Sequence, residues 1–268
     1  MKKLLSIILL IIFSQFQILS VLADSDGEIG ISSKKNNTEE GEVKDCFEGL
    51  NRGIFAFNQG LDKVIFKPMA SIYRTLPIPI KSGVSNSLDN LSNVITIPNN
   101  ILQGEFAKAG INTGRFVINS TVGILGLIDV ASLMGFEEYE KEDYGQTLAT
   151  YGAGPGCYIV LPVLGPSTAR DTISLASNFL GGDAWYNVTV RNDTHYFRDI
   201  DYYSSKITGG VDFRAKNYDS IENLKENSID FYASVKSLYL QNRAQKIANS
   251  SVTNKSQDDS EWEEIDNQ

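Results

Sequence analysis

The sequence predicts a mainly α-helical protein. Apolar residues recur at spacings near three and four along several long segments, with polar residues between them, which is the pattern of amphipathic helices. Proline and glycine separate these segments and mark the connections between helices. No long run of alternating apolar and polar residues stands between hairpin turns, so an extensive β-sheet is not expected.

Residues 47–73 show the first amphipathic pattern. Polar side chains such as Asn51, Asn58 and Asp62 fall between the apolar positions, so one face of the predicted helix is apolar. Pro68 lies inside this stretch and is expected to kink or end the helix. The apolar positions are Phe47, Leu50, Ile54, Phe57, Leu61, Val64, Ile65 and Ile72.

Residues 80–102 carry the second pattern, which Pro98 is expected to interrupt. A third helix is predicted to begin around Glu105. The apolar positions of these two helices are Val84, Leu88, Leu91, Ile95, Ile101, Ile111, Phe116, Val117, Ile118 and Val122.

Residues 111–135 are unusually apolar and long enough to cross a bilayer. Glycines at 123, 126 and 135 divide the stretch, which favours a broken helix or a helical hairpin. Arg115 and Asp129 would each cost about 2.5 to 3.5 kcal/mol at the centre of a membrane. We therefore expect this segment to lie within one leaflet or inside protein, and to provide the main membrane contact, with Leu127 and Leu133 among its apolar side chains.

The remaining helices are predicted from capping residues and glycine pairs. Ser167 or Thr168 can cap a helix that has Arg170 and Asp171 in its first turns and closes at residues 178–180. Beyond the glycine pairs at 181–182 and 209–210, helix starts are expected at residues 219–220 and at Ser228, the second leading into residues 229–248.

The two ends of the chain differ from its middle. Residues 1–23 have Lys2 and Lys3, an apolar run and a small residue at Ala23, which is the layout of a signal peptide, with an uncleaved anchor as the alternative. Residues 24–44 are predicted to form a flexible polar arm, residues 45–248 a single helical domain, and residues 249–268 a disordered acidic tail.

The charge of the exported chain is strongly negative. Without the signal peptide, 22 basic residues stand against 33 acidic ones, a formal charge of −11. Such a chain is repelled by nucleic acid and by anionic lipid surfaces, so no nucleic-acid partner is expected. Hydrophobic contact remains as the force for membrane binding.

The sequence offers no assembled catalytic or metal site. His195 is the single histidine, no G-x-S-x-G elbow accompanies it, and zinc sites with several His or Cys ligands are excluded by count. The glycine-rich stretch 152–156 lacks the Lys-Ser/Thr of a P-loop and is interpreted as a turn. An acidic cluster could bind a hard cation but lacks EF-hand spacing, so a solvated loop is favoured. It comprises Glu137, Glu138, Glu140, Glu142 and Asp143.

Three arginines lie beside apolar or small residues: Arg52, Arg115 and Arg170. Each guanidinium could contact a lipid phosphate. Internal ion pairing is the favoured alternative, because an unpaired arginine in such surroundings is costly. The candidate partners are Glu48, Asp129 and Asp171.

Several motifs occur in the order found in one known family. The densest is the region 142–171, which reads Glu-Asp-Tyr-Gly-Gln-Thr-Leu, then Gly-Ala-Gly-Pro-Gly-Cys-Tyr, then Leu-Pro-Val-Leu-Gly-Pro-Ser-Thr-Ala-Arg-Asp. Upstream blocks occupy residues 45–68, 102–104 and 115–131. Together they resemble the MlaA/VacJ family of outer-envelope proteins of Gram-negative bacteria, over about residues 45 to 175 and more weakly to about 245.

The resemblance implies a ring of amphipathic helices lying in one leaflet of the outer membrane around an amphipathic channel. It implies retrograde phospholipid transport without chemistry on the lipid and without a cofactor, and partners that are an outer-membrane porin trimer and a soluble periplasmic lipid carrier. An exported lipid hydrolase or a structural envelope-binding protein are the alternatives. The residues expected to control lipid passage are Asn51, Phe57, Asn58, Leu127, Asp129, Gln146 and Leu148.

The cysteines depart from the family pattern. Many members carry a lipid-modified cysteine after the signal peptide, where this chain has Asp24, so we expect a protein on the periplasmic face of the outer membrane that is not lipid-anchored. Cys46 and Cys157 stand where the family usually has proline. Either a compensating disulfide or two independent thiols would account for this double departure.

Overall fold

The computed structural model describes residues 43–138, 140–177 and 199–248. The chain divides into the units Met1–Glu42 and Val43–Gln268, and all described residues belong to the second. His195, the end of the predicted helix at residues 178–180, the arm before residue 43 and the acidic tail lie outside the described residues.

The first helical segment is continuous. It consists of α2 (Glu48–Leu61), a π-helical turn η1 (Asp62–Phe66) and α3 (Lys67–Arg74). Pro68 was expected to kink or end the helix, and of these alternatives the end is wrong, because Pro68 occupies the first turn of α3, directly after the π turn. At the change from the π turn to the α-helix, one backbone N–H has no helical acceptor. Proline has no N–H, so it fits that position without loss of a hydrogen bond.

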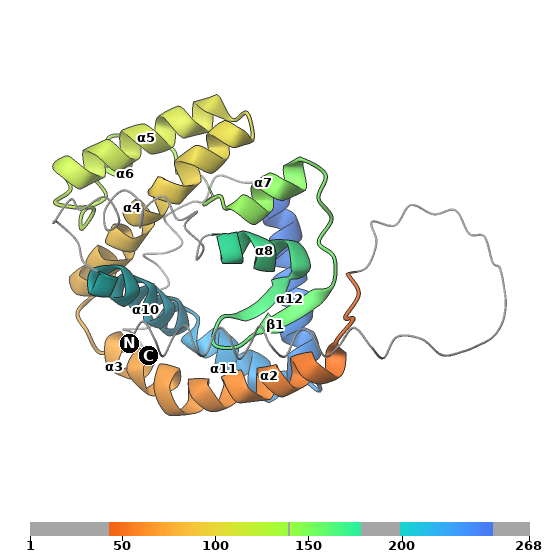
Figure 1. Cartoon of the computed structure of the whole chain (residues 1–268). Coiled ribbons are helices and arrows are strands. Elements are labelled where there is room, and N and C mark those ends of the chain that lie inside the picture. Colours follow the sequence, from red (N-terminus) through yellow and green to blue (C-terminus); the bar gives the residue numbers. More distant parts are fainter. Residues whose placement is uncertain (1–42, 139, 178–198, 249–268) are drawn as a thin grey trace. The chain divides into compact units, whose positions relative to one another are not determined.

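The helices α4 (Ile78–Leu102) and α5 (Phe106–Thr121) form a helical hairpin (Figure 1). Pro98 does not interrupt α4 as expected but lies inside it. The proline removes one helical hydrogen bond, to the carbonyl of Val94. The next two side chains attach this part of α4 to neighbouring segments, since Asn99 accepts a hydrogen bond from Thr147 and Asn100 accepts one from Asn112.

The apolar stretch after α5 is a tight turn followed by the short helix α6 (Val130–Leu133), which agrees with the predicted broken helix. A Cβ at Gly123 would lie 2.2 Å from the Ile128 carbonyl oxygen, so only glycine fits there. Ile124 and Leu125 adopt left-handed backbone conformations, with φ of 52° and 58°. These angles are strained for non-glycine residues and turn both side chains outward.

A small hairpin was not predicted. After α7 (Tyr144–Thr150), the antiparallel strands β1 (Tyr158–Leu161) and β2 (Gly165–Thr168) pair with Tyr158 opposite Thr168. Four-residue strands are too short to give an alternating pattern. Thr168 then caps α8 (Ala169–Ser177) by accepting a hydrogen bond from the Asp171 N–H at 3.2 Å.

The last three described helices are α10 (Asp199–Lys216), α11 (Tyr218–Asn227) and α12 (Phe231–Ile247). Gly209 and Gly210, expected to separate helices, lie inside α10, where packing of Val211 and Ala215 outweighs the cost of about 1 kcal/mol per glycine. The expected start at Ser228 falls two residues later, because Asp230 supplies the cap to the Ala233 N–H.

Contacts between elements close into a ring within this unit (Figure 1). From α2, contacts lead through η1 and α3 to α10, then to α4, α7 and α12, then through β2 and β1 back to α2. The mainly helical fold predicted from the residue patterns and the ring of helices implied by the family resemblance are therefore confirmed. Within the described residues, no helix combines the length and the apolar character that a membrane span requires.

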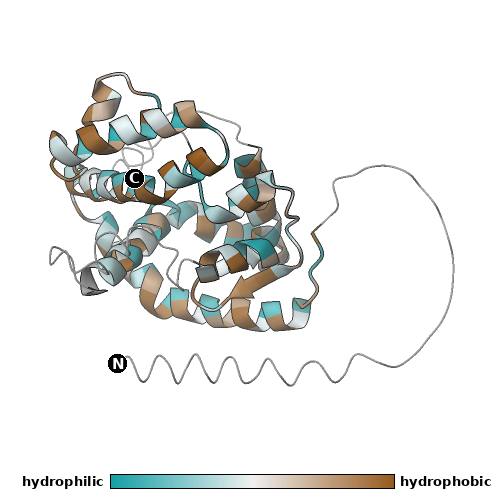
Figure 2. Cartoon of the chain, turned by 45° about the horizontal axis from the view of Figure 1, so that its top comes forward, coloured by the Kyte–Doolittle hydropathy of each residue, from teal (hydrophilic) through white to brown (hydrophobic). Residues whose placement is uncertain are grey.

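Burial in this unit is opposite to that of most water-soluble domains. Fully buried side chains are mostly polar, including Lys81, Thr96 and Asn99 at 0% exposure, whereas many large apolar side chains are exposed. Figure 2 shows apolar and polar residues interleaved along the helices. The helices are amphipathic, but their apolar faces are largely unpaired with other helices.

Candidate functional site

The residues expected to control lipid passage separate into two groups by exposure. The apolar members Phe57, Leu127 and Leu148 are 55%, 47% and 37% exposed. Of the polar members, Asn51, Asp129 and Gln146 are buried, and Asn58 is partly buried.

Asn51 and Asn58 fasten α2 to the β-hairpin. The Asn51 amide donates to the Tyr158 carbonyl at 3.0 Å and accepts from the Val160 N–H at 2.9 Å. Two helical turns further along α2, Asn58 donates to the Leu161 carbonyl at 2.9 Å and accepts from the Val163 N–H at 2.7 Å. Both amides mimic a neighbouring strand, so their hydrogen-bonding groups are occupied by protein.

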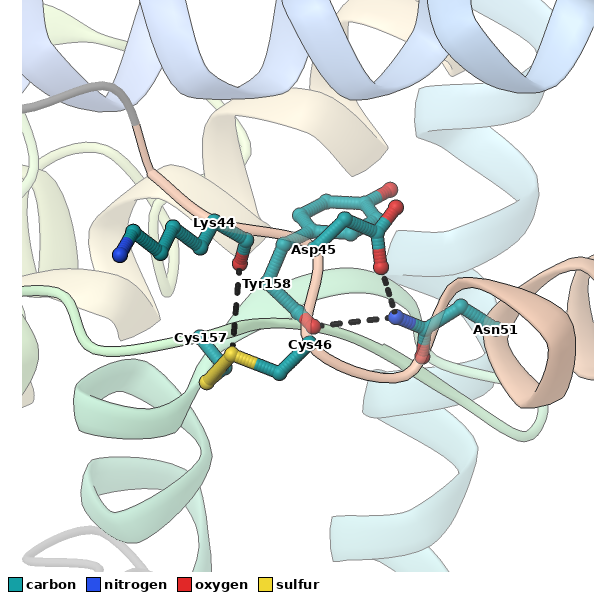
Figure 3. The surroundings of a disulfide bond; sticks show 6 residues. All are labelled: Lys44, Asp45, Cys46, Asn51, Cys157 and Tyr158. Atoms are coloured by element: carbon teal, nitrogen blue, oxygen red, sulfur yellow. Dashed lines mark hydrogen bonds between the residues drawn. A yellow bond between two sulfur atoms is a disulfide. The ribbon is translucent and has the colours of Figure 1, made fainter. Parts of the chain in front are cut away.

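The same junction holds a disulfide. Cys46 and Cys157 are joined with their Cα atoms 5.6 Å apart, next to Asn51 and Tyr158 (Figure 3). Asp45 accepts hydrogen bonds from Asn51 at 2.8 Å and from the Tyr232 hydroxyl at 2.5 Å. Burial tends to raise the pKa of Asp45, but these hydrogen bonds lower it overall, and burial beside Asp45 raises the pKa of Tyr232.

Asp129 organises the turn between α5 and α6. Its carboxylate pairs with Arg115 at 2.9 Å, accepts from Asn119 at 2.8 Å and caps α6 at the Ser132 N–H. Arg115 also donates to the Phe136 carbonyl at 3.0 Å. The two ionic side chains are 3% and 7% exposed, so the charges that argue against a membrane span are paired inside the protein.

Gln146 belongs to a node that joins α7, α8 and α12. Arg243 of α12 donates to Asp143 at 2.6 Å, to Asp171 at 2.8 Å and to the Gln146 side-chain oxygen at 3.1 Å. Burial tends to raise the pKa of Asp171, but hydrogen bonds from Arg243 outweigh it and the pKa is lowered. A Cβ at position 145 would lie 2.4 Å from an Asp171 oxygen, so Gly145 allows the node to close.

The three singled-out arginines are paired with acidic residues. Arg52 binds Glu48 at 2.7 Å and Asp230 at 2.7 Å, and Arg170 contacts Asp171 at 3.1 Å. With the Arg115–Asp129 pair, these contacts follow the internal pairing favoured by the sequence. The arrangement gives no support to direct phosphate contact by these guanidinium groups.

A polar layer between α4, α5 and α7 was not recognised from the sequence. Asn112 donates to Asn100 at 2.9 Å, Asn90 donates to Ser120 at 2.8 Å, and Thr147 donates to Asn99 at 2.6 Å. A signal was present, because polar residues recur at spacings of three and four along α4. We call the buried amides Asn90, Asn93, Asn99, Asn100, Asn112 and Asn119 the asparagine layer.

The outer surface of the same region is apolar. Eight large apolar side chains in residues 117–134 are between 47% and 81% exposed, with Leu125 at 73% and Leu133 at 81%. We call this surface the apolar tip, which consists of Val117, Val122, Ile124, Leu125, Leu127, Ile128, Leu133 and Met134. A second exposed row follows the first helical segment at Leu50, Phe57, Val64, Ile65, Met69 and Ile72.

The acidic cluster does not form one metal site. Within the residues that the structure describes, no group of three or more His, Cys, Asp or Glu side chains could hold a metal ion. Glu142 is buried and Asp143 caps α7, so these two are structural, in contrast to the solvated loop expected for the whole cluster. The glycine-rich stretch 152–156 forms turns, with Gly152 and Gly156 at positive φ.

A helical ring with a polar interior and exposed apolar rows is typical of proteins that contact lipid. The family described as MlaA lipoprotein matches residues 43–246. The chain therefore belongs to the MlaA family.

Relatives and a solved structure agree with this assignment. An Escherichia coli (strain K12) protein named intermembrane phospholipid transport system lipoprotein MlaA is 30% identical over 82% of this chain and 84% of its own length. An uncharacterised protein of Rickettsia prowazekii (strain Madrid E) is 42% identical, but the match spans about half of each protein, 52% of this chain and 55% of the relative. A solved structure described as the structural basis for maintenance of bacterial outer membrane lipid asymmetry has a TM-score of 0.64 and 33% identity, and covers 77% of this chain and all (100%) of its own.

Proposed function

We propose that this protein removes mislocalised phospholipids from the outer leaflet of the outer membrane and delivers them to a soluble periplasmic carrier, without chemistry on the lipid. The observation that carries the proposal is the reversal of polarity around the α4–α5 hairpin. Amides and ion pairs fill its interior, and the apolar tip faces outward. Family membership supports the same role, because a relative is named for intermembrane phospholipid transport.

The apolar tip and the row along α2 to α3 are proposed to rest among acyl chains on the periplasmic side of the outer membrane. Burying one exposed leucine in hydrocarbon is worth about 1.5 to 3 kcal/mol. On this scale, the eight side chains of the apolar tip are proposed to hold the protein without electrostatic attraction. Although relatives are named lipoproteins, Cys46 and Cys157 are joined to one another, so hydrophobic contact is the proposed anchor here.

Within the passage-controlling set, we assign different roles to the two groups. Phe57, Leu127 and Leu148 are exposed and are proposed to contact acyl chains. The buried amides and Asp129 are proposed to hold α2, α6 and α7 in position for those contacts. A porin trimer and a soluble carrier remain the proposed partners, in keeping with the family.

Extraction of labelled phospholipid tests the proposal. The wild-type protein in vesicles should transfer intact lipid to an acceptor, and Leu127→Asn with Leu148→Asn should reduce transfer. Leu238→Asn is the matched control, since Leu238 is 59% exposed on α12, a helix that carries none of these residues. Lysophospholipid or free fatty acid produced by the wild type would favour the hydrolase alternative, and lipid binding without transfer would favour a structural role.

A further inference from the structure

Glu142 differs from the other buried acidic residues of the described chain. Asp129, Glu142 and Asp212 are each less than a tenth exposed. Asp129 pairs with Arg115 at 2.9 Å, and Asp212 lies 3.7 Å from Lys216. Glu142 has no lysine or arginine nitrogen within ion-pair distance among the described residues.

The partners of Glu142 are uncharged groups from two helices. Its Oε2 atom accepts from Gln103 at the end of α4 at 2.9 Å and from Gln146 of α7 at 2.6 Å. Its backbone N–H donates to the Thr96 hydroxyl of α4 at 3.3 Å. The Oε1 atom is buried and has no hydrogen-bond partner. The carboxyl group therefore lies in the junction between α4 and α7 and touches both.

The charged groups around this junction do not neutralise an ionised Glu142. Glu105 and Asp143 are acidic, and Lys108 of α5 is paired with Glu105 at 3.0 Å. Arg243 of α12 is paired with Asp143 at 2.6 Å. A buried carboxylate without a counter-ion is costly, and protonation removes that cost.

We propose that Glu142 forms a proton-linked contact between α4 and α7. The protonated side chain holds α7 against α4, and loss of the proton loosens that contact. Burial first raises the pKa of Glu142 above its ordinary value of about 4.5. The hydrogen bond from Gln103 and the charge of Lys108 oppose this shift without reversing it, and Glu105 and Asp143 add to it. At pH values between the pKa of Glu142 in the unfolded chain and its raised pKa in the folded protein, the folded state binds more protons than the unfolded state. Stability contributed by Glu142 is therefore full below the unfolded pKa and is lost as the pH rises through the folded pKa.

The proton-linked contact would regulate the mobility of α7, the helix that carries Leu148. The contact between α4 and α7 is one of the joints through which the ring closes. Loosening it would free α7 while Arg243 still holds the start of that helix at Asp143. Only this consequence for lipid passage rests on the proposed function, since the proton linkage itself concerns the fold.

Thermal unfolding of the full chain in detergent, between about pH 5 and about pH 8, tests the linkage. The wild-type midpoint should fall as the pH rises, and Glu142→Gln, which mimics the protonated form, should show a shallower slope and an equal or higher midpoint at the upper end. Asp212→Asn is the matched control, because it removes a buried carboxylate that is paired with Lys216. That variant should lower the midpoint throughout the range.

Hydrogen exchange locates the effect. After correction for the intrinsic rate, protection of the α7 amides should drop with rising pH by at most about tenfold per pH unit, the limit for one linked proton. Glu142→Gln should remove this dependence. The proposal is overturned by an unchanged pH slope in Glu142→Gln, by a loss of midpoint in that variant equal to that of Asp212→Asn, or by a dependence on Na⁺ or Mg²⁺ in place of pH.

Infrared spectroscopy of the wild type covers the case in which Glu142→Gln does not fold. As the pH is lowered, a carboxylic acid band from Glu142 should appear before the bands of the ordinary exposed carboxyl groups, which take up protons only near about pH 4. Growth of that band only together with those of the exposed groups would overturn the proposal without any variant.

Discussion

The two sides of the ring are built from different materials. On one side is a region that we call the hairpin platform, formed by β1, β2 and the disulfide together with Tyr232 of α12. Its buried residues Tyr158, Val160 and Tyr232 form an apolar cluster, with the rings of Phe55 and Tyr232 5.4 Å apart. On the other side is the asparagine layer, where the buried apolar side chains of α4 to α7 are limited to Ala109 and Ala131 among the described residues.

The difference between the hairpin platform and the asparagine layer indicates the environment to which each is suited. The hairpin platform hides apolar surface, as a protein does in water. Around the asparagine layer, amides are buried and the apolar tip is exposed. This arrangement is stable only if the outer surroundings cannot hydrogen-bond, or if the amides of the layer hydrogen-bond fully to one another. One chain thus combines a water-type core and a lipid-type core.

The largest expected effect tests whether the lipid-type side depends on its ion pair. Asp129→Ala should lower the free energy of unfolding by about 3 to 5 kcal/mol, because it leaves the buried Arg115 charge with only the longer contact to Glu138, at 3.7 Å. Denaturant unfolding in detergent measures the change. Asp219→Ala breaks the Arg74 pair, in which Asp219 is 52% exposed, and should cost less than about 1 kcal/mol. Equal losses in the two variants would contradict the distinction.

The next effect concerns the covalent link of the hairpin platform. Reduction, or replacement of Cys46 and Cys157 by serine, should lower the free energy of unfolding by about 2 to 4 kcal/mol, because the bond closes a long loop in the unfolded chain. Mass spectrometry of the unreduced exported protein should find no alkylatable thiol. Two free thiols in the native protein would contradict the disulfide.

A smaller effect separates an amide-filled core from an apolar one. Asn112→Leu keeps the branching of the side chain, with methyl groups in place of the smaller amide atoms, and should cost about 1 to 3 kcal/mol, because the Asn100 side-chain oxygen loses its buried donor. Asn223→Leu on the exposed face of α11 should change stability by no more than about 0.5 kcal/mol. If Asn112→Leu stabilised the protein, the asparagine layer would be an ordinary core that tolerates polar residues.

The smallest effect on stability should accompany the largest effect on location. Leu125→Asp with Leu133→Asp changes side chains that are 73% and 81% exposed, so each should alter the free energy of unfolding by no more than about 0.5 kcal/mol. The double variant should nevertheless leave vesicles in a flotation assay, because two acyl-chain contacts are lost. Full retention on vesicles would move the anchor to another surface, such as the row along α2 to α3.

The sequence predicted those features that local patterns encode. Spacings of three and four placed α2, α4 and α5, and paired departures to cysteine pointed to Cys46 and Cys157 together. The β-hairpin was missed because its strands are short and are held by Asn51 and Asn58, which lie more than a hundred residues away, as the 107-residue separation of Asn51 and Tyr158 shows. The sequence predicted these two asparagines as residues that control lipid passage, and gave no sign that their amides complete a sheet edge.

The asparagine layer was missed for a different reason. The helix at α4 was predicted from its apolar positions alone, and its polar stripe was given no role. Where the surroundings are lipid, the polar stripe is the buried one. The same reversal explains why Pro98 is tolerated, since the buried amides beside it hold the helix.

The link between Cys46 and Cys157 also has a mechanical consequence. The two residues are 111 positions apart, so the bond encloses α2 through α7 in a covalent loop. A force applied between the two ends of the chain would pass across the sulfur atoms and bypass that loop. About 400 Å of extended chain, at roughly 3.6 Å per residue, would stay hidden until the bond was reduced. In a stretching experiment, the asparagine layer would carry no load, and the hairpin platform would yield first.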